Sequence, residues 1–213
     1  MRKFAIAMLI LIPLSAVVFF IGWTQFKVKA ENVGVVISKT SGVSEVPVEN
    51  GVFSWHWQFL VPGNATLRTF SIKPLNVTES VAGELSAGGA YGSYSFTFAV
   101  SLTVSPENLV RLVKLNRVTD SDDLRSYMEQ AAKTVSQLAA DYYLKKASEN
   151  QDFRPESVRR DDLLRVIRMY EDFPELELTV FALTSSKLPD FELYRRYRTH
   201  LFYEQESAEN EES

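Results

Sequence analysis

The chain contains no cysteine and has only two histidines, His56 and His200, among its 213 residues. The absence of cysteine excludes thiol catalysis, disulfide bonds, cysteine-ligated zinc and a lipoprotein anchor. His56 lies between two tryptophans, and His200 follows an arginine-rich stretch, so we interpret both as exposed or hydrogen-bonded residues. Because nucleophilic catalysis needs a base that a third group orients, we expect a protein that is not an enzyme.

The sequence also has no charge pattern that would indicate a charged ligand. The formal net charge is −4, which does not favour nucleic acid as a partner. A phosphate-binding glycine loop followed by lysine is missing, so no cofactor is predicted. Asp120, Asp122 and Asp123 cluster at a predicted helix start, where acids stabilise the helix dipole without an ion. We therefore predict no metal site.

A run of 20 uncharged residues from Phe4 to Trp23 opens the chain. It has the length that a helix needs to cross a bilayer core of about 30 Å. It is longer than the apolar core of a signal peptide, and no A-x-A cleavage site stands at its end. We therefore interpret residues 1–26 as a retained anchor in the inner cell membrane, with a cleaved signal as the alternative.

The topology of the anchor rests on Pro13 and on flanking charge. Arg2 and Lys3 precede the apolar run, and Lys27 and Lys29 follow it. By a small margin this favours a single span with the N-terminus in the cytoplasm and the domain outside. The alternative is a hairpin with its apex at Pro13 and a cytoplasmic domain.

Alternation and helical spacing predict an α+β domain over residues 27–187. Strands are expected at 33–38, 53–61, 65–72, 94–104 and 176–184, with a glycine-rich loop at 82–92. Helices are expected at 106–116, from Ser121, and from Arg154 to Phe173. The first and last strands are expected to share a mostly antiparallel sheet, with the helices on one side. Residues 188–203 begin a last helix, and the acidic residues 204–213 should be disordered.

Four local matches resemble the stomatin/prohibitin/flotillin (band 7, SPFH) domain family. Residues 31–36 are similar to the family's opening E-x-G-V-V strand, and residues 51–62 resemble its G-x-H-x-x-x-P hairpin. Residues 96–109 resemble V-x-V-x-Y-R-V-x-D-P, with Ser-Pro where Asp-Pro is usual. Residues 176–198 resemble its strand, L-P and arginine-rich helix start. The likeness covers residues 1 to about 203.

The resemblance implies a membrane-anchored scaffold that assembles with copies of itself or with related SPFH-type subunits. In the family, a long coiled coil usually follows the last helix. Here residues 190–203 allow less than two heptads, so assembly is expected to depend on side-to-side packing of the domains. The glycine-rich loop at 82–92 also replaces the family's usual short connection.

Two groups of residues have alternative predicted roles. Trp55, Trp57 and Phe59 fill the core or contact lipid headgroups; we favour the core, with Leu60, Val61 and Pro62 as the better lipid contacts. Arg195, Arg196 and Arg198 form either a subunit contact or, as we favour, a solvated helix face.

The leading hypothesis is a non-enzymatic scaffold that self-associates at the membrane and organises a partner such as a membrane protease. The alternative is a monomeric, anchored extracytoplasmic binding module for a small ligand or an envelope partner. A hydrolase is a distant third.

Overall fold

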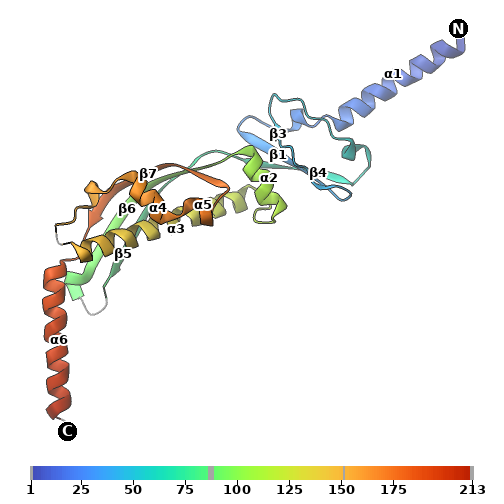
Figure 1. Cartoon of the computed structure of the whole chain (residues 1–213). Helices are drawn as coiled ribbons and strands as arrows, with labels where there is room; N and C mark the ends of the chain where they lie inside the picture. Colours follow the sequence, from blue (N-terminus) through green and yellow to red (C-terminus); the bar gives the residue numbers. More distant parts are fainter. Residues whose placement is uncertain (1, 86–88, 151, 212–213) are drawn as a thin grey trace. The chain divides into compact units, whose positions relative to one another are not determined.

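The computed structural model describes residues 2–85, 89–150 and 152–211, and the chain divides into two compact units (Figure 1). Unit 1 comprises Met1–Pro74, Thr103–Met128 and Glu175–Glu177, and unit 2 comprises Leu75–Leu102, Glu129–Pro174 and Leu178–Ser213. The chain is α+β with antiparallel strands and an N-terminal apolar helix, as the sequence predicted. The segment 27–187, expected to be one domain, is shared between the two units.

Unit 1 holds an apolar helix, a small sheet and the first helix that follows the sheet. Its elements are α1 (Arg2–Gly22), the 3-10 helix η1 (Gln25–Lys27), β1 (Asn32–Ser38), β2 (Gly42–Val43), β3 (Val48–Glu49), the 3-10 helix η2 (Trp57–Leu60), β4 (Ala65–Ser71) and α2 (Pro106–Lys114). The unit also contains the first eight residues of α3 (Ser121–Glu149).

The central strand of unit 1 is β1, which is buried on both faces. It pairs along its whole length with antiparallel β4, and its other edge pairs with β3 and then β2. Gly34 is required here because a Cβ atom on it would lie 2.7 Å from Leu67 Cδ1 and 2.9 Å from Val28 Cγ2. Val28, Val36 and Val48 form the core on that side.

Unit 2 is built on the sheet β5-β6-β7. Its elements are β5 (Leu75–Glu84), η3 (Gly89–Gly92), most of β6 (Ser93–Val104), most of α3, η4 (Pro155–Ser157), α4 (Arg160–Ile167), α5 (Met169–Asp172), most of β7 (Leu176–Lys187) and α6 (Phe191–Glu211). β5 pairs antiparallel with β6 from Leu75↔Leu102 to Glu84↔Ser93. The alternating apolar face of β6 packs on α3, where Tyr143 stacks on Phe96 with ring centroids 5.6 Å apart.

Local start and stop signals behave as the sequence predicted. The Ser105 hydroxyl caps α2 by accepting a hydrogen bond from Asn108 N at 3.2 Å, and Pro106 occupies the first helical position. Asp120 Oδ1 accepts from the amides of Asp122 and Asp123, both at 2.9 Å, at the start of α3. These carboxylates therefore serve the helix end.

The sheet arrangement corrects one prediction. β1 and β7 do not share a sheet: β1 pairs with β2, β3 and β4, whereas β7 joins β5 and β6. The hydroxyl of Thr179 lies 2.9 Å from Ser101 Oγ, and that of Thr184 donates to Thr97 O at 2.9 Å, so β7 runs antiparallel to β6. An apolar alternation fixes which face of a strand is buried and leaves its neighbour unspecified.

Several element boundaries also differ from the prediction. The predicted strand at 53–61 is wrong, because this segment forms one isolated bridge at Trp55 and then η2. Part of the predicted loop at 82–92 belongs to β5 and η3, and residues 86–88 lie outside the described residues. The helix expected at 154–173 is broken at Arg168, whose φ is +48°. The last helix continues to Glu211 through a segment expected to be disordered.

Candidate membrane-proximal site

The apolar helix α1 is the starting point of the candidate site. Residues Lys3–Gly22 have a mean hydropathy of 2.8, and the helix is exposed along most of its length. By length and composition the helix is able to cross a membrane, a property that a signal sequence shares. The helix continues through Pro13 without turning back.

The end of α1 is fastened to the loop before η2 by hydrogen bonds. Trp55 Nε1 donates to Phe19 O at 3.1 Å, and His56 N donates to Gly22 O at 2.8 Å. Just beyond the helix, Thr24 N donates to Ser54 O at 3.0 Å. The last carbonyls of a helix have no partner within it, so the amide of His56 satisfies the Gly22 carbonyl, which would otherwise need water. We call these contacts the junction.

Aromatic packing closes the junction. Phe53 stacks on Phe19 with centroids 5.9 Å apart, and it also contacts Trp23 at 6.2 Å. Gly22 lets the indole of Trp55 lie directly against the helix, because a Cβ atom on Gly22 would overlap that ring, with Cδ1 at 2.9 Å and two ring atoms closer still. The helix end and the loop therefore form one packed body.

The aromatic residues around the junction remain exposed, which corrects the prediction that the tryptophans fill the core. Trp57 is 50% exposed and Trp55 37%, and of the predicted aromatic face Phe59 packs against the core of unit 1. The tip residues, Leu60, Val61 and Pro62, are exposed as well. The alternation at 53–61 predicted a strand, but a strand needs a neighbouring strand to pair with. Here backbone groups of Ser54 and His56 form hydrogen bonds with the end of α1 instead.

A cation accompanies this exposed apolar surface. Lys27 Nζ lies 4.9 Å from the ring centroid of Phe59 and 5.7 Å from that of Phe26. Tryptophan, together with lysine whose stem covers apolar surface, is typical of the boundary between lipid and water. The surface made by Phe26, Phe53, Trp55, Trp57, Leu60 and Val61 is hereafter the aromatic collar. The sequence predicted lipid contact as one role of its last four residues and missed Phe26 and Phe53, as well as Phe19 and Gly22 at the junction.

His56 takes part in the junction through its backbone and its ring. Its Nε2 atom lies 2.9 Å from Ser54 Oγ, and burial lowers the pKa of the imidazole. The arrangement supports a structural role, because the histidine's amide holds the end of α1.

The carboxylates of Asp120 and Asp123 hold the start of α3. Asp123 accepts hydrogen bonds from the amide and the hydroxyl of Thr119, and these bonds lower the pKa of its carboxyl. Among the described residues no cluster of three or more potential ligands is arranged for a metal ion.

The sequence did not predict one buried acidic residue, Glu175. Glu175 is 3% exposed and its Oε2 accepts from the hydroxyl of Tyr127 at 3.3 Å, with Arg117 Nη1 3.6 Å away. Burial raises the pKa of the Tyr127 hydroxyl. Glu175 lies 48 residues from Tyr127 in the sequence, so no local pattern predicts the group. It ties the start of β7 to α3 within unit 1.

The arginines of the last helix have separate contacts. Arg195 Nη2 donates to Ser148 O at 3.0 Å, and Arg196 forms an ion pair with Glu192 of the same helix. Arg198 lies beside Phe202 along a shallow hollow on α6.

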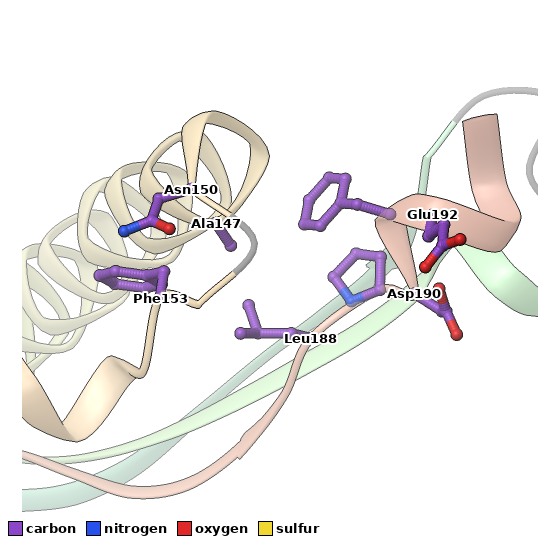
Figure 2. Close-up of a pocket in the computed structure, with 8 residues that line it drawn as sticks. Ala147, Asn150, Phe153, Leu188, Asp190 and Glu192 are labelled. Atoms are coloured by element: carbon purple, nitrogen blue, oxygen red, sulfur yellow. The ribbon is translucent and has the colours of Figure 1, made fainter.

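Unit 2 also contains a cavity of about 310 Å³ where α3 ends and α6 begins (Figure 2). Asn150 and Phe153 line one side, and Asp190 and Glu192 the other. Asp190 Oδ1 accepts from Leu193 N at 3.0 Å, and Glu192 is the partner of Arg196. Both carboxylates are therefore already engaged by α6.

Comparison with known proteins finds sequence similarity to a protein that has no assigned role. No family model matches the chain. It is 23% identical over 205 residues to an uncharacterized protein of Treponema pallidum (strain Nichols), covering 91% of this chain and 69% of that protein.

Proposed function

We propose that this chain is a non-enzymatic, membrane-anchored scaffold of the stomatin/prohibitin/flotillin type. It self-associates at the membrane surface and organises a partner such as a membrane protease. The observation that carries the proposal is the junction. If the anchor only tethered a freely moving domain, a polar linker would be expected between the two. Here the C-terminal end of α1 is instead hydrogen-bonded to and packed against the rest of unit 1, with contacts no more than two residues beyond the helix.

The aromatic collar supports the same role. Its side chains expose apolar surface beside the C-terminal end of an apolar helix, where headgroups would cover them. In this proposal α1 crosses the inner cell membrane with the N-terminus in the cytoplasm, and the collar lies in the headgroup region of the outer face.

The position of the collar can be tested without introducing a probe. All three tryptophans of the chain, Trp23, Trp55 and Trp57, belong to the junction or to the collar. In nanodiscs made with lipids brominated near the headgroup, we expect strong quenching of tryptophan fluorescence. Trp57→Phe should remove part of the quenched signal, and unbrominated nanodiscs are the control. Unquenched tryptophan fluorescence would place the collar outside the bilayer and contradict its proposed position in the headgroup region.

Self-association is tested by crosslinking and native mass spectrometry in mild detergent or nanodiscs. We expect an assembly that survives deletion of residues 190–213 and weakens when residues 1–26 are removed, because anchoring raises the effective concentration of the domains. A strictly monomeric chain at native density would contradict the scaffold. Protease accessibility of residues 190–213 in sealed vesicles distinguishes the single span from the hairpin.

The second candidate function is a monomeric binding module outside the cytoplasm, and the cavity of Figure 2 favours it. Its volume of about 310 Å³ is at the lower end of the range for small-molecule sites. This function predicts a monomer whose melting temperature rises with a specific ligand, and an Asn150→Leu variant that loses the rise.

A further inference from the structure

β5 forms one edge of the sheet in unit 2. Among the described residues it pairs only with β6, in a register that runs without interruption from Leu75↔Leu102 to Glu84↔Ser93. The backbone N–H and C=O groups along its other side therefore have no strand partner. Unpaired edges of this kind are templates for pairing with another chain.

Proteins usually protect such an edge with a short strand, proline, lysine or a bulge. β5 is ten residues long, and its sequence, LNVTESVAGE, is described throughout and contains neither proline nor lysine. Its pairing with β6 has no bulge. Positions along β5 alternate between half-buried and exposed, so Val77 and Val81 keep apolar surface that a further strand would cover. The edge is therefore suited to accept one more strand.

Pairing of β5 with β5 of a second copy is constrained by the two faces of the sheet. In an antiparallel pair, residues directly opposite each other point to the same face. A twofold axis through a residue of β5 therefore places half-buried positions opposite half-buried ones, whereas an axis between two residues would place them opposite exposed ones. Two face-matched registers pair the most residues. One has its axis at Glu79 and pairs residues 75–83, and the other has its axis at Ser80 and pairs residues 76–84.

Charge selects between these two registers. An axis at Glu79 would place two Glu79 side chains directly opposite each other, which is unfavourable. With the axis at Ser80, Glu79 lies opposite Val81. The exposed carboxylate of Glu84 then lies opposite the exposed amide of Asn76. Because an amide donates to a carboxylate, this register gives a favourable contact at each end of the paired strands.

We propose that β5 pairs antiparallel with β5 of a second copy, about a twofold axis at Ser80. The inference rests on the proposed self-association and names the surface through which the domains pack side by side. The two sheets of unit 2 become one continuous sheet in the order β7-β6-β5-β5-β6-β7. The contact is symmetric, so each β5 edge covers the other and the pair is closed.

Cysteine crosslinking measures the register directly. The chain has no cysteine, so Ser80→Cys provides a single thiol at the proposed axis. Directly opposite Cβ atoms lie about 5 Å apart, within reach of a short thiol-specific crosslinker. Thr78→Cys is the matched control on the same face of the same strand, and its two thiols would be about 13 Å apart along the strand. With the full-length chain in nanodiscs holding several copies, we expect about fivefold more crosslinked dimer from Ser80→Cys than from Thr78→Cys.

Charge variants test the pairing itself, with the dimer fraction measured by native mass spectrometry. Ser80→Lys brings two lysines directly opposite each other, and we expect association to weaken about 3- to 10-fold. Thr78→Lys adds the same charge two residues away. In the proposed register this lysine lies diagonal to Glu84 of the second copy, so association should be unchanged or stronger. Both side chains are exposed, so neither change should disturb the folding of unit 2, which circular dichroism checks.

The outcomes separate this inference from the proposed function. Preferential crosslinking of Ser80→Cys, together with weakening by Ser80→Lys alone, supports the pairing. An assembled chain in which Ser80→Cys crosslinks no better than Thr78→Cys overturns the pairing and leaves the scaffold standing. The same holds if Ser80→Lys weakens association no more than Thr78→Lys. A monomeric chain overturns both.

Discussion

Replacing Gly22 with alanine is the sharpest test of the junction, because two physical effects predict opposite signs. Alanine is a better helix former than glycine by roughly 0.5–1 kcal/mol, so propensity alone predicts that the substitution stabilises α1. The structure predicts the reverse. A methyl group at Gly22 would overlap the indole of Trp55, whose Cδ1 would be 2.9 Å away.

The magnitude follows from the contacts that the indole must leave. Moving the ring breaks the hydrogen bond from Trp55 Nε1 to Phe19 O, which is worth about 1 kcal/mol. It also disturbs the packing between Phe53 and Phe19, worth about 0.5–1.5 kcal/mol. After the gain in helix propensity is subtracted, the junction should weaken by about 0.5–2 kcal/mol.

Hydrogen exchange measures this effect at the junction. The amide of His56 donates to Gly22 O, so its exchange reports opening of the junction. We expect Gly22→Ala in nanodiscs to speed this exchange about 2- to 30-fold. In a Trp55→Ala background the same substitution should be neutral or stabilising, because the overlap is gone. Unchanged or slower exchange in the chain that keeps Trp55 would refute the reasoning.

Three further changes test other parts of the structure. Arg117→Ala removes the cation beside the buried Glu175 and should lower the free energy of unfolding, measured by denaturant titration, by about 2 kcal/mol. The control Arg111→Ala, on an exposed face of α2, should change this free energy by less than about 0.5 kcal/mol. Equal effects of the two substitutions would contradict the contribution of Arg117 to the group around Glu175. Burial lowers the pKa of His56, so its contribution to stability is complete above the unfolded pKa of about 6.5 and is lost as the pH falls below that value. The protection factor of the junction amides, which is corrected for the intrinsic exchange rate at each pH, should therefore fall at acidic pH, and His56→Gln should remove this dependence. Ser105→Ala removes the cap of α2 and should cost about 1 kcal/mol in thermal unfolding; no loss would mean that the cap contributes nothing.

The parts of the fold that the sequence predicted are those that depend on neighbours along the chain. β6 follows from its alternation, and α2 from a cap and a proline at its start. α3 follows from its apolar stripe, and the later part of its buried face includes Ala140 and Tyr143. Each of these signals lies inside the element it defines.

The parts that the sequence missed depend on residues far apart in the chain. β5 has partly buried positions along one face and exposed ones along the other, and it becomes a strand through its pairing with β6. Residues 53–61 carry the same alternating pattern as a strand, yet their backbone groups bond to the end of α1. An alternating pattern therefore indicates a half-buried segment without stating what the segment pairs with.

The candidate site shows the same division. Crossing a bilayer needs only apolar residues in sufficient number, and any sequence of that kind between Phe4 and Val18 meets the requirement. Docking of the helix end needs particular residues at particular places, namely an aromatic ring at Phe19 and the absence of a side chain at Gly22. Composition predicts that the helix is long and apolar enough to cross a bilayer. It does not predict how the helix end docks, because the partner Trp55 lies more than thirty residues away. The last turn of α1 is thus the part of this helix that a generic apolar helix could not replace.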